Sequence, residues 1–218
     1  VALEHAGQIL RAERMMREAL ADVARRARAL RVGTVAPVPL WRLTALMTER
    51  FPGLVLTSQM LAEDEVECGV VDGDLDLGIS LRPLALPMVR STRLMVENLA
   101  VVLPSEHKLA GRSSVSMAEL DGETFLLLKD IGFWRQVCDQ HLPHSEFIVQ
   151  EDRGVFEGLV RSSPLPHFVT DAPFFSDAAP ERVVVPIRDT AAYATFYLLA
   201  RAGCRQEAEN LFDWVSRQ

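Results

Sequence analysis

The sequence predicts an α/β fold: two lobes, each a parallel sheet covered by helices, joined by two crossing strands and preceded by a long helix. Three observations lead to this expectation. Short strand-like segments alternate with helical segments from residue 30 onward, and the same alternation begins again near residue 124. Between them, the strand-like run TRLMVENLAVVLP at residues 92–104 is long enough to connect two lobes. Alternating strands and helices favour parallel sheets.

The first thirty residues are expected to form one long helix. They contain no proline and are rich in Ala, Leu, Met, Arg and Glu, which are strong helix formers. Apolar residues recur along it at helical spacing, at Leu3, Leu10, Met16, Leu20, Val23, Ala27 and Leu30. A single helix cannot bury such a stripe against itself. We therefore expect it to pack against a partner helix or a neighbouring chain.

The first lobe is expected to follow a β-α-β-α-β order. Its predicted elements are a strand at 30–35, a helix at 40–51 entered through Pro37 and Pro39, a strand at 54–58, a helix at 63–71 and a strand at 75–79. Pro52 and Gly53 mark the turn that follows the first helix.

The second half of the chain is expected to repeat this plan. Its predicted elements are a strand at 124–128, a helix at 132–142, a strand at 146–150, a helix at 155–162, strands at 167–171, 182–187 and 194–201, and an amphipathic terminal helix at 204–218. Two lobes of this kind enclose a cleft, and ligand groups gather at the carboxyl ends of their strands.

The stretch GVVDGDLDLGIS at residues 69–80 carries aspartates at alternate positions, Asp72, Asp74 and Asp76. A calcium loop of the EF-hand type would need glycine at its sixth position and glutamate at its twelfth, where Leu77 and Pro83 stand. Apolar residues alternate with the aspartates, which is the period of a strand. We therefore interpret the stretch as a helix that ends at Gly73 and is followed by a buried strand, not as a metal site.

Composition and charge limit the possible functions. No apolar run approaches the about 20 residues that span a bilayer, and the chain does not open with a signal peptide. Three widely spaced cysteines, Cys68, Cys138 and Cys204, suggest free thiols in a reducing compartment. The net charge of -7 argues against nucleic-acid binding by this chain itself. We expect a cytoplasmic protein without membrane contacts.

Candidates for catalysis or metal binding are few. Cys138 and His141 share a helix face in CDQH, but no second cluster of ligands accompanies them. Sequences of the types GxSxG, Walker A, GxGxxG and HExxH are absent. His167 lies between strand-forming residues and is expected to be a packed core histidine. We expect no catalytic site, no cofactor and no metal site.

Taken in order, several segments resemble the LysR-type transcriptional regulators of bacteria. The opening VALEHAGQILRAERMM is similar to the end of that family's DNA-binding wing and the start of its linker helix. LRVG, RFPGLVLTSQ and VVDGDLDLGI are similar to its first regulatory subdomain. ENLAVVLPSEHKLAGRSSVSMAELDGETFLLL resembles its crossing strand and the start of the second subdomain.

The resemblance implies an organisation and a function. It implies two Rossmann-like lobes of periplasmic-binding-protein type II architecture, with a dimerisation helix at 1–29, subdomain 1 at 30–96 and 196–218, and subdomain 2 at 97–195. A small-molecule effector would bind between the lobes, and the linker helix would transmit its presence to a DNA-binding domain. The family's N-terminal winged helix is absent here, which suggests a fragment that contacts DNA only through that missing part.

The resemblance also implies a homodimer, with a tetramer in the full-length protein. We expect an apolar surface in the dimer contact around Leu43, Met47, Leu54 and Leu56. The alternative is a solute-binding protein or a small-molecule transferase on the same bilobal fold. A secreted binding protein should carry a signal peptide and no linker helix, and an enzyme should present a catalytic set.

The effector site is expected where strands end at the cleft. The candidates are Thr34, Val35, Ala36, Pro37, Ser58, Gln59, Met60, Ser80, Arg82, Lys129, Asp130, Arg153 and Thr170. Many LysR-type members place a serine or threonine near the Ala36-Pro37 position to hold a carboxylate, and this chain does not. We therefore expect a partly apolar or aromatic effector with one polar end, which Lys129 or Thr170 would meet. Ala36 is expected at a loop edge.

Overall fold

The computed structural model describes residues 29–172 and 181–218, together with Glu13, Met15 and Met16. The linker helix expected over residues 1–29 falls almost wholly outside these residues. That helix therefore stays a prediction.

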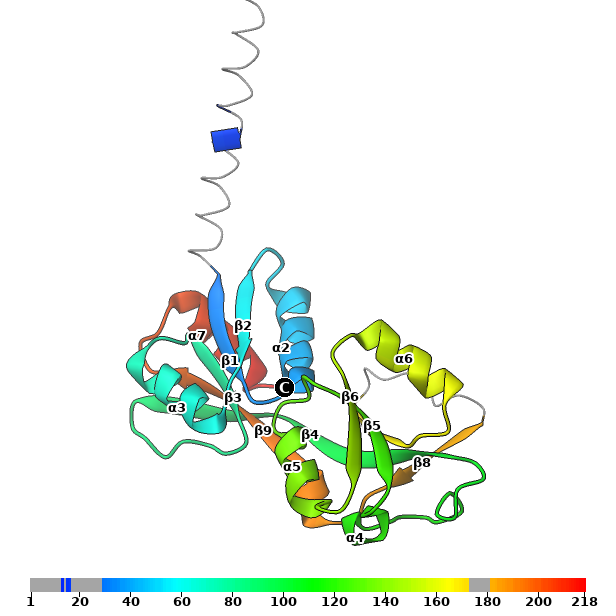
Figure 1. Cartoon of the computed structure of the whole chain (residues 1–218). Coiled ribbons are helices and arrows are strands. Elements are labelled where there is room, and N and C mark those ends of the chain that lie inside the picture. The colour runs from blue at the N-terminus through cyan, green and yellow to red at the C-terminus, as the bar shows by residue number, and fades with distance from the viewer. Residues whose placement is uncertain (1–12, 14, 17–28, 173–180) are drawn as a thin grey trace, which may run out of the picture.

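The described elements follow the expected alternation of strands and helices (Figure 1). In the first half these are β1 (Leu30–Thr34), α2 (Pro37–Arg50), β2 (Leu56–Met60), α3 (Glu63–Asp72), β3 (Leu77–Ser80) and β4 (Val89–Pro104). In the second half they are α4 (Met117–Leu120), β5 (Thr124–Leu128), α5 (Trp134–His141), β6 (Glu146–Gln150), α6 (Arg153–Ser162), β7 (His167–Thr170), β8 (Arg182–Pro186), a 3-10 helix at Thr190–Ala192, β9 (Tyr193–Arg201) and α7 (Gln206–Val215).

The strands form two parallel groups joined by antiparallel strands. The order of the described strands is β2-β1-β3-β9-β4-β7-β5-β6, and β8 pairs with β4 beside this path. β1 is parallel to β2 and β3, and β5 is parallel to β6 and β7. β9 runs antiparallel to β3 and β4. The expected pair of α/β lobes is therefore confirmed.

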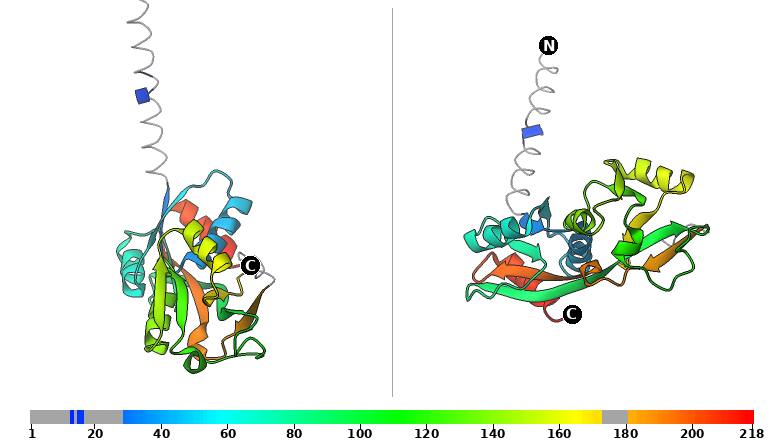
Figure 2. Two further views of the ribbon diagram at one scale, coloured as in Figure 1. Left: turned by 45° about the vertical axis from the view of Figure 1, so that its right-hand side comes forward. Right: turned by 60° about the horizontal axis from the view of Figure 1, so that its bottom comes forward.

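β4 runs through both lobes. From Val89 to Asn98 it pairs with β9, and from Leu99 onward it pairs with β7 and β8. Figures 1 and 2 show β4 and β9 as the long strands that cross between the two lobes. The strand-like run at residues 92–104 was thus correctly predicted as the connection, because it is long enough to pass through both lobes. The subdomain limits at residues 96–97 and 195–196 stay a prediction.

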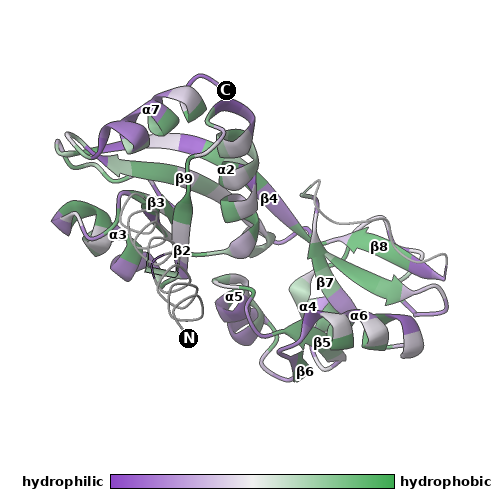
Figure 3. Cartoon of the chain, turned by 90° about the horizontal axis from the view of Figure 1, so that it is seen from above, coloured by the Kyte–Doolittle hydropathy of each residue, from purple (hydrophilic) through white to green (hydrophobic). Residues whose placement is uncertain are grey.

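In the first lobe, glycines let α3 approach the sheet closely. A Cβ at Gly78 would lie 2.7 Å from Cγ2 of Val70 and 2.8 Å from Cγ1 of Val66. α2 and α7 contribute the rest of the core, with Leu46, Leu211 and Phe212 all buried. Figure 3 shows both hydrophobic and hydrophilic residues along α7.

The prediction that Leu43 and Met47 belong to an apolar dimer surface is wrong. Leu43 is 0% exposed and Met47 is 4% exposed, so both belong to the core of the monomer. Leu54 and Leu56 are only partly buried and pack against the same core. The apolar face of α2 was assigned to a partner because the sequence does not show which sheet a helix covers.

The aspartate-rich stretch is a helix–strand joint, as expected. α3 ends at Gly73, which adopts a left-handed conformation with φ of 85°. Asp76 is 4% exposed, and its carboxylate accepts hydrogen bonds from the backbone N–H of Arg31 at 2.8 Å and from the Arg31 guanidinium at 3.1 Å. Asp76 therefore fastens β1 to the segment before β3.

Some boundaries differ from the expectation. β2 begins at Leu56 rather than at residue 54, because the N–H of Leu54 still bonds to the carbonyl of Phe51 in the turn. The short helix α4 was not predicted, although Ser116 and Glu119 form a capping box there. Within the described part of the chain, no helix is both long and apolar enough to cross a membrane.

Candidate functional site

A cavity of about 780 Å³ lies between the first lobe and the second. The N-terminal end of α2 contributes Pro37 and Val38, and all other lining residues come from β4 and the second lobe. We call this space the interlobe cavity. Its volume suits a molecule the size of a metabolite or drug.

Its lining combines apolar strands with charged groups. The apolar members are Pro37, Val38, Leu99, Val102, Leu126, Leu127, Leu128, Ile131, Trp134, Phe156, Val160, Phe168, Val169, Ala172 and Val184. The polar and charged members are Asp130, Arg153, Glu157, Arg161, His167, Thr170, Asp171 and Arg182. As many arginines as acidic residues line the cavity, so it has no large excess of either charge.

Two contacts join the lobes beside this cavity. The N–H of Phe133, which precedes α5, donates a hydrogen bond to the carbonyl of Val35 at 2.9 Å. The guanidinium of Arg153 at the start of α6 lies 5.5 Å from the ring centroid of Trp41 on α2, a cation–π contact. The mutual position of α2 and α6 therefore depends in part on Arg153, which also lines the cavity.

A buried carboxylate sits where β4 changes partners. Glu97 is 0% exposed and accepts hydrogen bonds from Nε1 of Trp134 at 3.1 Å and from Oγ1 of Thr170 at 2.9 Å. Burial raises the pKa of Glu97, and the two hydrogen bonds partly oppose that change. Glu97 thus links the crossing strand to α5 and β7, both of which line the interlobe cavity.

Pro37, Asp130, Arg153 and Thr170 are the sequence-predicted residues that line the interlobe cavity. α2 offers little to an anion at this point, because Pro37 and Pro39 lack N–H groups in its first turn. The hydroxyl of Thr170 already donates to Glu97.

Thr34, Val35 and Ala36 are buried beside the cavity. The hydroxyl of Thr34 donates to the carbonyl of Ala36 at 2.7 Å and so stabilises the local turn that follows β1. Ala36 is 0% exposed, because Gly132 of the second lobe packs against it. The expectation that Ala36 lies at a loop edge is wrong, so a bulky residue there would disturb the fold rather than only fill the cleft.

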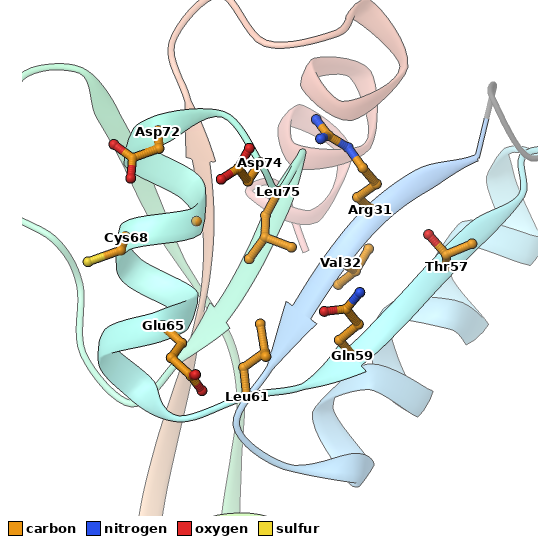
Figure 4. A pocket seen from close by; sticks show the side chains of 11 residues that line it. Arg31, Val32, Thr57, Gln59, Leu61, Glu65, Cys68, Asp72, Asp74 and Leu75 are labelled. Atoms are coloured by element: carbon orange, nitrogen blue, oxygen red, sulfur yellow. The ribbon is translucent and has the colours of Figure 1, made fainter.

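Ser58, Gln59 and Met60 lie on the exposed edge strand β2. Gln59 lines a second, shallower cavity of about 430 Å³ between β1, β2 and α3. Figure 4 shows it with acidic side chains of α3, Glu65 and Asp72, on one side and Gln59 on the other. The sheet edge thus separates these three residues from the lining of the interlobe cavity.

The polar groups of three further candidates, Ser80, Arg82 and Lys129, already have carboxylate partners. Ser80 is buried and donates to Glu63 at 3.1 Å, and Arg82 donates two hydrogen bonds to Glu67 at 2.7 and 2.9 Å. The ammonium of Lys129 lies 2.6 Å from Glu151, which raises the pKa of Lys129. None of these three side chains belongs to the lining of the interlobe cavity.

Sequence reasoning missed Glu97, Trp134 and Arg182 as site residues. Glu97 could have been noticed, because it is an acidic residue inside an otherwise apolar strand. His167 was correctly predicted to be buried, and it is 7% exposed. Its position in the lining was not foreseen, since that depends on strand pairing.

Burial holds the thiol of Cys138 in its protonated form. Cys138 is 1% exposed, and desolvation raises its pKa to about 12. His141, which was considered together with Cys138 as a possible catalytic or metal-binding pair, is exposed on the last turn of α5. Cys138 is therefore not a thiolate at neutral pH, which is the form in which a cysteine acts as a nucleophile.

Comparison with known proteins identifies the family. The LysR substrate binding domain matches residues 24–156, more than half of the chain. The chain belongs to this family. The resemblance noted from the sequence motifs is therefore confirmed.

The curated relatives of this LysR-family chain are transcriptional regulators. It is 32% identical over 89 residues to the Hca operon transcriptional activator HcaR of Escherichia coli K12, covering 41% of this chain and 28% of HcaR. It is 34% identical over 104 residues to a probable hydrogen peroxide-inducible genes activator of Streptomyces viridosporus, covering 46% and 33%. The matches span less than half the length of these relatives.

Solved structures of LysR-type regulators share the fold. The reduced OxyR regulatory domain of Pseudomonas aeruginosa superposes with a TM-score of 0.63 at 19% identity, covering 87% of this chain and 95% of OxyR. The BenM effector binding domain with its effector benzoate gives 0.59 at 18%, covering 87% and 90%. The periplasmic-binding-protein type II architecture expected from the sequence is thereby confirmed.

Proposed function

We propose that this chain is the effector-sensing region of a bacterial LysR-type transcription regulator and binds a small molecule in the interlobe cavity. The observation that carries the proposal is that cavity itself, because α2 of one lobe and β7 and α6 of the other contribute to one lining. A ligand that contacts both lobes stabilises one mutual arrangement of them over others.

Transmission of the signal would use the crossing strands and the linker helix. β4 contributes Leu99 and Val102 to the lining and continues into the first lobe. β1, which follows the expected linker helix directly, pairs with β3, and β3 pairs with β9 beside β4. A change in the angle between the lobes would therefore reach the linker helix through hydrogen-bonded strands.

Small-molecule sensing is favoured over enzymatic activity and over thiol-based peroxide sensing. One curated relative is named a probable hydrogen peroxide-inducible genes activator, and one structural neighbour is the reduced OxyR regulatory domain. A peroxide-sensing thiol needs a lowered pKa, whereas burial raises the pKa of both Cys138 and Cys204. The same property of Cys138 argues against a thiol-dependent transferase, so the proposal includes that this chain is not an enzyme.

The proposal includes partners and location. We propose a homodimer, tetrameric in a full-length regulator, that works in the cytoplasm and contacts DNA through a winged helix preceding the linker helix. A full-length CbnR in complex with its target DNA matches this chain at a TM-score of 0.59 and 17% identity. The exposed edge strand β2, with Val55 beside it, is a candidate for part of the dimer contact in place of Leu43 and Met47.

A thermal-shift screen tests the ligand-binding function. Because a ligand that binds only the folded state raises the melting temperature, metabolites including benzoate are screened at millimolar concentration. A matched pair of variants locates the site: Val184→Trp fills the cavity, whereas Val183→Trp changes the neighbouring residue, which does not line it. Both side chains are partly exposed, at 46% and 36%, so both variants should fold.

A hit should stabilise the wild type and Val183→Trp but not Val184→Trp. Equal stabilisation of the two variants would place the ligand elsewhere and contradict the proposed site.

A further inference from the structure

One face of the second lobe's sheet gathers polar groups within the interlobe cavity. Val102 of β4 pairs with His167 of β7 on one side and with Val184 of β8 on the other. Directly paired residues point to the same face, and so do residues two apart, which adds Arg182. These side chains all line the cavity, and Phe156 and Val160 of α6 line it opposite them.

His167 brings a buried imidazole to this face of the sheet. It is 7% exposed, and its Nδ1 has no hydrogen-bond partner among the described residues. Burial, assisted by the charge of Arg182, lowers the pKa of His167 to about 4, so the imidazole is neutral at physiological pH. Phe156 packs against it edge-on, with 5.8 Å between ring centroids. An unpaired buried polar atom is costly, which indicates that a ligand group completes this site.

Arg182 brings a positive charge to the same place. Its guanidinium donates to the carbonyls of Val160 at 2.7 Å, Leu165 at 2.9 Å and Ser163. Within the described residues no carboxylate pairs with it, and burial alone lowers its pKa. The carbonyls accept some of its five N–H groups but carry no negative charge, so no described residue neutralises the charge of Arg182.

We propose that the part of the interlobe cavity beneath α6 is an anion subsite, in which Arg182 and His167 receive the single acidic group of an otherwise apolar ligand. Guanidinium N–H groups not used by the carbonyls donate to one carboxylate oxygen, and a neutral imidazole protonated at Nδ1 donates to the other. Val102, Val184, Leu126 and Phe156 enclose the apolar body of the ligand.

The charge balance of the whole cavity sets the ligand class. Asp130, Glu157 and Asp171 also belong to the lining and offset the charges of Arg153, Arg161 and Arg182, so the cavity has no surplus of positive charge for a second anionic group. A monoanion, such as an aromatic monocarboxylate, is therefore favoured over a dicarboxylate or a phosphate. This inference rests on the proposed function and replaces Lys129 and Thr170, which have carboxylate partners of their own, as the expected contacts of the polar end.

The test compares two probes of the same shape and different charge. The dissociation constants of 2-naphthoate and its neutral amide are measured by calorimetry at pH 7.5 on the whole chain. We expect the acid to bind at least about tenfold more tightly than the amide, since a charged hydrogen-bonded pair contributes more than 1.4 kcal/mol. The preference should fall to about twofold or less in Arg182→Gln and should decrease in His167→Phe.

Arg188→Gln is the matched control, because Arg188 lies outside the cavity and pairs with Glu119 at 2.8 Å. It should keep the preference for the acid. Circular dichroism checks folding, since Arg182 also bonds to the carbonyls that end α6. If Arg182→Gln does not fold, His167→Phe decides, because its ring retains the contact with Phe156 and loses only the nitrogens.

Three results would overturn the anion subsite: equal binding of both probes to the wild type, a preference that survives in folded Arg182→Gln, or no binding of either probe up to millimolar concentration. Equal binding that Val184→Trp abolishes would refute the subsite and leave the proposed function intact. If no metabolite in the broader thermal-shift screen stabilises the chain, the proposed function itself is refuted.

Discussion

The carbonyl oxygen of Val35 lies 2.2 Å from the position that a Cβ would take at Gly132. The same oxygen accepts a hydrogen bond from the N–H of Phe133 at 2.9 Å. Val35 directly follows β1 of one lobe, whereas Gly132 shortly precedes α5 of the other. The two lobes therefore touch backbone to backbone at a point where only glycine fits, next to the cavity proposed for the effector.

Gly132→Ala should separate the lobes. Gly132 has φ of 63° and Gly122 has φ of 93°, but a Cβ at Gly122 would meet nothing within 4 Å. Gly122→Ala is therefore a control with similar backbone strain and no clash. We expect Gly132→Ala to lower the free energy of unfolding by about 1–3 kcal/mol more than the control. Urea denaturation measures this difference, and small-angle scattering should show a larger radius of gyration for Gly132→Ala alone. Equal losses in both variants would mean that the contact does not hold the lobes.

Glu97→Gln should change how stability depends on pH. Because burial raises the pKa of Glu97 in the folded state, the folded chain binds a proton more readily than the unfolded chain. The contribution of Glu97 to stability is therefore present at low pH and is lost as pH rises through the folded-state pKa. The melting temperature of the wild type relative to Glu97→Gln should accordingly be higher at pH 5 than at pH 8. An unchanged difference between these pH values would contradict the assignment.

Asp76→Ala should destabilise the first lobe through a lost tie rather than a lost metal. Removal of the carboxylate leaves the partly buried N–H of Arg31 without its acceptor, which costs about 1–3 kcal/mol. Asp74→Ala is the matched control, since Asp74 is exposed. Urea denaturation should show a loss for Asp76→Ala and less than about 0.5 kcal/mol for Asp74→Ala. Calcium at 5 mM, at least about five hundredfold above the dissociation constant of a sensor site, should alter neither value.

Cys138 should resist alkylation in the folded protein. Its pKa of about 12 and its burial leave almost no thiolate at neutral pH, whereas Cys68 is exposed. Iodoacetamide at pH 7.5 should modify Cys68 at least about tenfold faster than Cys138, as followed by mass spectrometry. In denaturant the two rates should become similar. Rapid modification of Cys138 in the folded chain would revive a redox or catalytic role.

The order of helices and strands could largely be predicted from the sequence, because turn residues and apolar patterns act on the segment in which they occur. Gly73 ends α3 in the left-handed conformation that glycine favours. The strands at residues 124–128 and 146–150 are found where the apolar runs predicted them. Boundaries shifted at β2, where the turn after Phe51 uses two more residues than the pattern indicates.

The candidate site was predicted only in part. Pro37, Asp130, Arg153 and Thr170 were expected from the rule that ligands gather at strand ends, and they line the cavity. Ser80, Arg82 and Lys129 satisfy the same rule, but neighbouring carboxylates occupy their polar groups. The identity of a side chain's partner is a property of distant residues, so a position at a strand end could not distinguish these cases.

The sequence by itself determined the alternation of strands and helices, the crossing strand and the family. These depend on periodicity, on turn residues and on motifs that each occupy a short stretch of chain. Only the tertiary structure brought Glu97 to Trp134 and Thr170, and placed His167 of β7 and Arg182 of β8 on the two sides of β4. An alternating pattern states that a strand has two faces, but it does not state which strand will lie beside it, because backbone hydrogen bonds are the same for every residue.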